Sequence, residues 1–295
     1  MTGVGRPRTY IRFEQRDKIE TSHAALLRYV AAEGSPLERY RTLLRHQANF
    51  LKWVEQRHVQ LTAAKEEIAT LKGTPPTTGP NGPKSETFRK YQAYSQQLVL
   101  LEAINGFEVF FKNTFIELAR CLRPYVQDER VSGSVDARAL WMYGESIDPV
   151  AVLLESRLFH DTEQIDKVTH MLVGKKYYSS AADARRKALR CIFQIRHTLS
   201  HNSGVITHSD ASKFALLGYK AKPDEFISPA NDGLSLVVFE FLEDEAAYYT
   251  DWLRTQTIDY LVSCMNRLSA VLPVETREGL IACLGGDAAT YSSIP

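Results

Sequence analysis

The stretch VLLEAINGFEVFFKNTFIELA, residues 99–119, is unusually rich in large apolar side chains. Its phenylalanines and leucines recur every three or four residues, which is the spacing of an amphipathic α-helix. The pattern extends on both sides and predicts one long helix over residues 85–122 with a wide apolar surface. Asn105 and Gly106 stand near its middle, where a kink or an interruption is expected because glycine weakens a helix.

The region before this helix also follows a helical pattern, except in its first and last segments. Residues 1–16 are polar and basic and predict a loose arm. Apolar residues at helical spacing predict a helix over residues 17–32, and an extended helix or a helix pair over residues 37–72. Residues 73–84 (GTPPTTGPNGPK) predict a flexible linker or an exposed loop, because proline and glycine at this density exclude a helix.

The segments after the long helix are mostly helical as well. Residues 128–144 predict a loop, and the following helices are expected to start at Pro149, at Thr162 and near Ala181. Residues 233–242 (GLSLVVFEFL) predict a short β-strand, because β-branched and aromatic residues partly alternate there. Two further helices are expected at the end of the chain, over residues 244–272 and 275–284.

The fold class predicted from these patterns is all-α, or nearly so, with one short β element. Prolines and glycines between the helical segments divide the sequence into four parts. These are an N-terminal helical region (1–72), a Pro/Gly-rich linker or loop (73–84), a helical bundle (85–272) and a short C-terminal helix with a tail (273–295).

Composition restricts the functions that the chain can have. Its formal net charge is +1, so any nucleic-acid binding depends on a local basic patch and not on an overall field. The four cysteines are scattered without a Cys-x-x-Cys pair, and no long uncharged apolar run is present. We therefore expect a cytoplasmic protein that is not inserted in a membrane. Phosphate-binding loops, dinucleotide-binding glycine motifs and the Gly-x-Ser-x-Gly elbow are missing from the sequence.

The stretch AADARRKALRCIFQIRHTLSHNSG, residues 181–204, carries the chemistry that is most specific in the chain. Apolar residues at helical spacing predict an amphipathic helix, and Asn202-Ser203-Gly204 predicts its end. The polar residues Arg196, His197 and His201 therefore fall in the last turns of this helix.

Arg196 and His201, separated by four residues, resemble the Arg-x4-6-His motif of the HEPN family of ribonucleases. Glu108 and Lys112 resemble the Glu-x-x-x-Lys element of the same family, although Asn113 stands where the family usually has a second basic residue. The resemblance covers residues 85–272. It implies a HEPN-like helical bundle, a homodimer whose paired motifs line one groove, and metal-independent cleavage of RNA without a cofactor.

The resemblance assigns roles to individual residues. His201 would be the general base or acid, Arg196 would bind the phosphate and stabilise its extra negative charge, and His197 would orient His201 or bind phosphate. The RNA's own 2′-hydroxyl would attack and leave a 2′,3′-cyclic phosphate and a 5′-hydroxyl. Glu108 and Lys112 would support the site, and the residues expected to bind the RNA backbone are Arg185, Arg186, Lys187, Arg190 and Asn202.

Arg196 and His201 do not share a face of a regular helix, because positions five apart differ by about 140° around its axis. They converge only if the helix frays beyond Leu199, or if a second copy of the chain completes the site. The apolar surface from Phe107 to Leu118, together with the helix of residues 181–201, is the expected interface for such a pairing.

Other interpretations of the same residues remain open. Glu108 and Lys112 can form an ordinary surface ion pair, and the arginine-rich face can be a solvated surface. His197 and His201 have the spacing of metal ligands, which would make the chain a metal-dependent hydrolase. The chain can also be a catalytically inactive dimeric binding or regulatory module. Through the family resemblance, the expected partners are RNA (tRNA or mRNA), a second copy of the chain, and an antitoxin or regulatory protein, in a toxin or anti-phage defence system.

Overall fold

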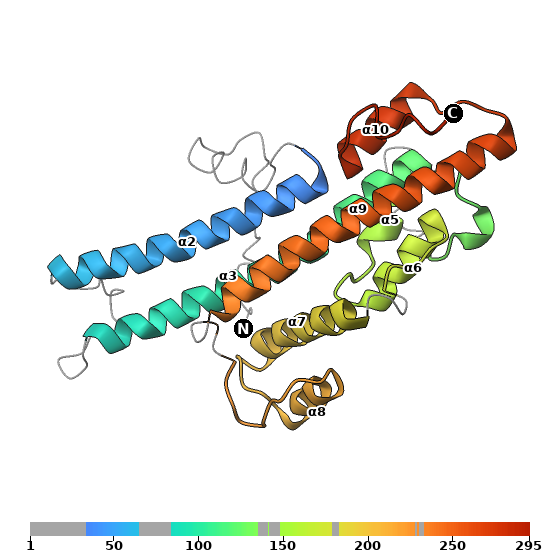
Figure 1. Ribbon diagram of the computed structural model, residues 1–295. Coiled ribbons are helices and arrows are strands. Elements are labelled where there is room, and N and C mark those ends of the chain that lie inside the picture. The colour runs from blue at the N-terminus through green and yellow to red at the C-terminus, as the bar shows by residue number, and fades with distance from the viewer. Residues whose placement is uncertain are drawn as a thin grey trace, which may run out of the picture.

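The computed structural model describes residues 34–64, 84–134, 141, 148–178, 183–227, 229 and 233–295. Their regular structure is helical, and no β-strand occurs among them, which confirms the prediction of an all-α fold. An isolated antiparallel bridge joins Val205 and Phe226. The helices, labelled as in Figure 1, are α2 (Pro36–Ala64), α3 (Lys84–Leu122), η2 (Asp128–Arg130), α5 (Pro149–Glu155), α6 (Thr162–Val173), α7 (Asp183–His201), α8 (His208–Leu216), α9 (Leu234–Leu268) and α10 (Val274–Leu284).

Helix α3 is the centre of the structure. It contacts α2, α5, α6, α7, α9 and α10, and the long helices α2, α3 and α9 lie along one another (Figure 1). Helix α7 lies against α3 and α9, and α8 is attached to the far end of α7. Between residues 99 and 119, only Glu102 and Val109 are exposed. The apolar stretch that predicted a long helix is therefore enclosed by other helices on most of its circumference.

The phenylalanines of α3 form the interior of the bundle. Phe107, Phe110, Phe111 and Phe115 are fully buried, and the Phe111 ring meets the ring of Tyr249 from α9 edge-on, with centroids 4.8 Å apart. The expected dimer interface from Phe107 to Leu118 is therefore wrong, because these side chains are buried by the other helices of the same chain. A helix that is apolar around most of its surface has to be covered, and here intramolecular packing covers it.

Gly106 does not interrupt α3, which continues without a break through this position. A Cβ atom at Gly106 would lie 2.3 Å from Leu43 Cδ2 and 3.3 Å from a ring carbon of Tyr40, both of α2. The hydroxyl of Tyr40 donates a hydrogen bond of 3.1 Å to the carbonyl of Ala103. The glycine that was expected to kink the helix instead lets α2 approach α3 closely, since it has no side chain to hold the two backbones apart.

The predicted strand over residues 233–242 is wrong, because α9 begins at Leu234 and continues to Leu268. Its first buried residues are Ser235, Val238, Phe239 and Leu242, which are spaced as on one face of a helix. Helical periodicity therefore outweighed the strand preference of the β-branched residues. At its other end α9 stops at Ser269, which has a φ of +49° and lies four residues before the expected Pro273.

The remaining predictions have mixed outcomes. The helix over residues 162–173 is confirmed, and so is the C-terminal helix, which runs from Val274 to Leu284. Helix α8 was not predicted, although Thr207 and Asp210 form a capping box at its start. Residues 37–64 belong to a single helix. The predictions for residues 1–16, 17–32 and 73–83 lie outside the described residues, and Lys84 is already part of α3.

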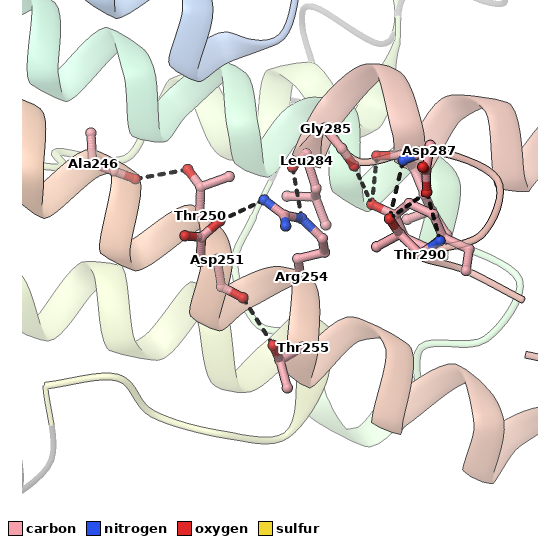
Figure 2. Close-up of polar contacts among 11 residues, drawn as sticks. Ala246, Thr250, Asp251, Arg254, Thr255, Leu284, Gly285, Asp287 and Thr290 are labelled. Carbon is pink, nitrogen blue, oxygen red and sulfur yellow. Dashed lines mark hydrogen bonds and ion pairs between the residues drawn. The ribbon is translucent and has the colours of Figure 1, made fainter. Parts of the chain in front are cut away.

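The two outer parts of the described chain are tied to the bundle. Tyr40 and Leu44 of α2 belong to the same core as the phenylalanines of α3. Figure 2 shows the second attachment, where Arg254 of α9 donates hydrogen bonds to the carbonyl of Leu284 (3.1 Å) and to Asp251 Oδ1 (2.6 Å). Beyond α10, the side chains of Tyr291 and Ile294 are buried. Among the described helices, none has the length and apolar character that a membrane span requires.

The close approach at Gly106 predicts the effect of adding one methyl group. We expect Gly106→Ala to lower the free energy of unfolding by about 1–2 kcal/mol, since steric overlap with Leu43 outweighs the helix propensity that alanine gains. In a Leu43→Ala background the overlap is removed, and the same change is expected to be neutral or stabilising. Urea denaturation of the four proteins measures both effects. An equal loss in the two backgrounds would contradict the contact with Leu43.

Candidate functional site

Helix α7 is regular up to His201 and stops where the sequence predicted. Ser203 and Gly204 have φ values of +52° and +85°, and the amide of Gly204 donates a hydrogen bond of 3.1 Å to the carbonyl of Thr198. The fraying beyond Leu199, one of the two ways in which Arg196 and His201 could converge, therefore does not occur. Arg196 and His201 consequently point about 140° apart around the axis of α7, and they do not form one site within a single chain.

Arg196 points toward α3. Its Nε donates a hydrogen bond of 2.8 Å to Asn105 Oδ1 and lies 3.5 Å from Glu108 Oε1. The side chain of Arg196 is 26% exposed and that of Glu108 is 18% exposed, so both lie at the edge of the bundle interior. The two motifs on which the family resemblance rests are thus brought into contact by the packing of α7 on α3.

Besides Arg196, Glu108 has a second neighbour that the sequence did not predict. His160, from the connection between α5 and α6, places its Nδ1 3.4 Å from Glu108 Oε1. The expected pair of Glu108 with Lys112 does not form, although both residues lie on α3 and both side chains are described. A spacing of four residues permits a same-face pair, but here Arg196 of α7 and His160 of the α5–α6 connection lie closer to the carboxylate of Glu108.

His197 and His201 lie on the solvent-exposed side of α7, with ring centroids 4.7 Å apart. Partial burial lowers the pKa of His197, and the positive charge of Lys213 on α8 lowers it further. The carboxylate of Asp210 acts in the opposite direction. Lowering the pKa favours the neutral form of the imidazole, which can accept a proton.

Asp210 attaches α8 to the end of α7. Its buried carboxylate accepts hydrogen bonds from Gln194 (2.8 Å), from Asn202 (2.8 Å) and from the amide of Thr207 (3.1 Å). Burial alone would raise the pKa of Asp210, but the hydrogen bonds from Thr207 and Asn202 outweigh burial and lower it. Asn202, which was expected to bind RNA, therefore has its amide engaged in holding α8 in place.

Two of the arginines that were expected to bind RNA are engaged within the protein. Arg185 forms an ion pair of 2.5 Å with Glu245, which is 0% exposed, and its guanidinium lies 4.0 Å from the centre of the Tyr248 ring. Glu245 also accepts a hydrogen bond of 2.8 Å from Tyr178. Arg186 donates to the hydroxyl of Thr162 and lies near Glu163, both of α6. These contacts give both arginines a structural role.

Lys187 and Arg190 are exposed, and they lie on the same side of α7 as the two histidines. Residues 187, 190, 194, 197 and 201 recur at alternating spacings of three and four, which places them along one face of the helix. We call Lys187, Arg190, His197 and His201 the α7 stripe. It combines two of the residues predicted to bind RNA, Lys187 and Arg190, with two of the predicted catalytic residues.

The described residues contain no group of three or more histidine, cysteine, aspartate or glutamate side chains placed to hold a metal ion. No protein-family model matches the chain, and comparisons with curated proteins and with solved structures found no match.

The contacts of Arg185 predict a structural role that Arg190 does not share. We expect Arg185→Ala to lower the free energy of unfolding by about 1–3 kcal/mol, because it leaves the buried carboxylate of Glu245 without its cation. Arg190→Ala, at an exposed position on the same helix, is expected to change it by less than about 0.5 kcal/mol. Thermal and urea denaturation compare the two variants. Equal stability of both would contradict the structural role of Arg185.

The environment of His197 predicts how its titration depends on α8. Removing the positive charge of Lys213 with Lys213→Ala should raise the pKa of His197, because a neighbouring cation disfavours the imidazolium form. The imidazole resonances followed by NMR against pH measure this shift. Lys222→Ala is the matched control, since Lys222 is an exposed lysine that pairs with Glu225. A pKa that is unchanged, or that falls, in Lys213→Ala would show that the two charges do not interact.

Proposed function

We propose that this chain is a metal-independent endoribonuclease of the HEPN type that acts as a homodimer. The observation that supports the proposal most directly is the contact of Arg196 with Asn105 and Glu108. The sequence singled out Glu108 and Arg196 separately, on motifs far apart in the chain, and folding places them side by side. A chance match of either motif alone would not require this contact.

In the proposed reaction, the 2′-hydroxyl of the RNA attacks the adjacent phosphorus and the 5′-oxygen leaves. Arg196 binds the phosphate, and its position is set by Asn105 and Glu108. His201 is exposed and transfers a proton, and His197 lies beside it. The α7 stripe adds Lys187 and Arg190 to hold the RNA backbone. DNA is not cleaved, because it lacks the attacking hydroxyl.

The proposal requires two copies of the chain at each site. Arg196 faces α3 while His201 faces solvent, so the two residues of one copy cannot reach the same phosphate. A two-fold arrangement lets Arg196 of one copy and His201 of the other meet across the interface. The interface cannot use the phenylalanines of α3, which are buried.

The biological setting follows from the family resemblance. We propose tRNA or mRNA as the substrate, a role as a toxin or anti-phage effector in the cytoplasm, and an antitoxin or regulatory protein as a partner. The second candidate function is a catalytically inactive dimeric binding module. It is favoured by the internal engagement of Arg185, Arg186 and Asn202, which leaves fewer groups to bind RNA.

Cleavage assays on total tRNA and on an mRNA test the enzymatic function. We expect Arg196→Ala and His201→Ala each to lower the rate by about 100-fold or more, with folding and dimerisation unchanged. The products should carry 2′,3′-cyclic phosphates, and excess EDTA should not reduce the rate. A wild-type protein that binds RNA without cleaving it would support the binding module. Loss of activity in EDTA would support a metal-dependent hydrolase.

Mixing the two inactive variants tests whether the site is shared between copies. After subunit exchange, a heterodimer of Arg196→Ala and His201→Ala contains one site with both residues intact. Random exchange is therefore expected to restore about a quarter of the wild-type activity. Each variant mixed with itself is the control and should stay inactive. If the mixture is inactive although exchange is complete, Arg196 and His201 act within one chain or not at all.

A further inference from the structure

The proposed cleavage involves two proton transfers, one from the 2′-hydroxyl and one to the leaving 5′-oxygen. His201 accounts for one of them. A second group would have to stand next to Arg196, because Arg196 marks the position of the phosphate in the proposed function. His160 is the histidine that the structure places there, through its contact with Glu108.

The backbone on both sides of His160 is fixed. Phe159 is buried, with its ring 5.2 Å from the ring of Phe115 in α3. Asp161 is the N-cap of α6, and its side chain accepts a hydrogen bond of 2.9 Å from the amide of Glu163. His160 is therefore held at the edge of the bundle by a core contact before it and by a helix cap after it.

The imidazole of His160 lies beside the carboxylate of Glu108. Its Nδ1 is buried and lies 3.4 Å from Glu108 Oε1 without a hydrogen bond between them, whereas the side chain as a whole is 37% exposed. The exposed part of the side chain therefore lies away from Nδ1. A carboxylate at this distance from Nδ1 favours the tautomer that carries the proton on Nδ1, which leaves Nε2 able to accept one. The same carboxylate oxygen lies 3.5 Å from Arg196 Nε, so the imidazole and the guanidinium both stand next to Glu108.

We propose that His160 is the general base of the RNA cleavage and that Glu108 is its positioning residue, which rests on the proposed function. Nε2 of His160 takes the proton of the 2′-hydroxyl while the 2′-oxygen forms its bond to phosphorus. The bond from phosphorus to the 5′-oxygen breaks, and His201 of the second copy gives its proton to that oxygen. Arg196 stabilises the negative charge on the phosphate between these steps. The reaction needs no oxidant, reductant or further co-reactant.

The first test replaces the imidazole and keeps the fold. We expect His160→Asn to lower kcat about 100-fold or more with KM changed less than about threefold, because it removes a proton acceptor and not a binding group. Glu108→Gln should lower kcat less, and it should change the pH dependence of the rate, because the imidazole loses the charge that orients it. His170→Asn, at an exposed histidine of α6, is the matched control and should retain full activity.

The second test assigns His160 to a half of the shared site. His160, Glu108 and Arg196 come from one copy, so a mixture of His160→Asn with Arg196→Ala contains no intact site and should stay inactive. A mixture of His160→Asn with His201→Ala contains one intact site per heterodimer and should recover about a quarter of the wild-type activity. The pattern distinguishes a base beside Arg196 from a residue that only supports folding, because a folding defect would not be rescued selectively by one partner.

The outcomes separate this inference from the function on which it rests. Activity of His160→Asn within threefold of the wild type, or recovery when it is mixed with Arg196→Ala, overturns the role of His160 and leaves the ribonuclease intact. Absence of cleavage by the wild-type protein on any RNA overturns both. Circular dichroism and the thermal midpoint of each variant show whether a loss of activity comes from unfolding, and in that case His160→Gln, which is closer in length, is tested in the same mixtures.

Discussion

The enclosure of α3 is the constraint on which the rest of the structure depends. A helix that carries phenylalanine at positions 107, 110, 111 and 115 exposes apolar area on several sides at once, so a single neighbour cannot cover it. Helices α2, α5, α6, α7, α9 and α10 all contact it. Gly106 permits the close approach of α2, because α2 can come against a position without a side chain. These helices are thus arranged around α3 and bury its apolar side chains.

The burial of α3 by the other helices also limits the positions at which its polar side chains can reach the edge of the bundle. Asn105 and Glu108 lie where α7 meets α3, and Glu108 also faces the α5–α6 connection. Glu108 is partly exposed there, between Arg196 and His160. Glu245, in contrast, is fully buried and is satisfied by Arg185 and Tyr178. A buried and fully paired carboxylate supports the fold, whereas Glu108 lies at the edge of the bundle, with Arg196 and His160 within 3.5 Å of its carboxylate.

The regularity of α7 sets a second constraint, on the way the proposed site is completed. Because the helix does not fray, Arg196 is held toward α3 and His201 toward solvent. Asp210 stabilises this arrangement by joining α8 to Gln194 and Asn202 at the end of α7. Because Arg196 and His201 are held apart, the proposed site needs a second copy of the chain. A flexible helix end could have brought the two residues together within one chain.

The sequence by itself determined the all-α class, the bounds of the helix over residues 162–173, the C-terminal helix and the end of α7 near Ser203 and Gly204, because periodicity, caps and stop signals are local properties. It misassigned residues 233–242, where strand preference and helical spacing conflict within ten residues. Only the tertiary structure decided that the phenylalanine surface of α3 is interior, that Arg185 belongs to Glu245, and that Glu108 faces His160 and Arg196 in place of Lys112. These are contacts between elements far apart in the chain, and they depend on how whole helices pack, which no local pattern encodes.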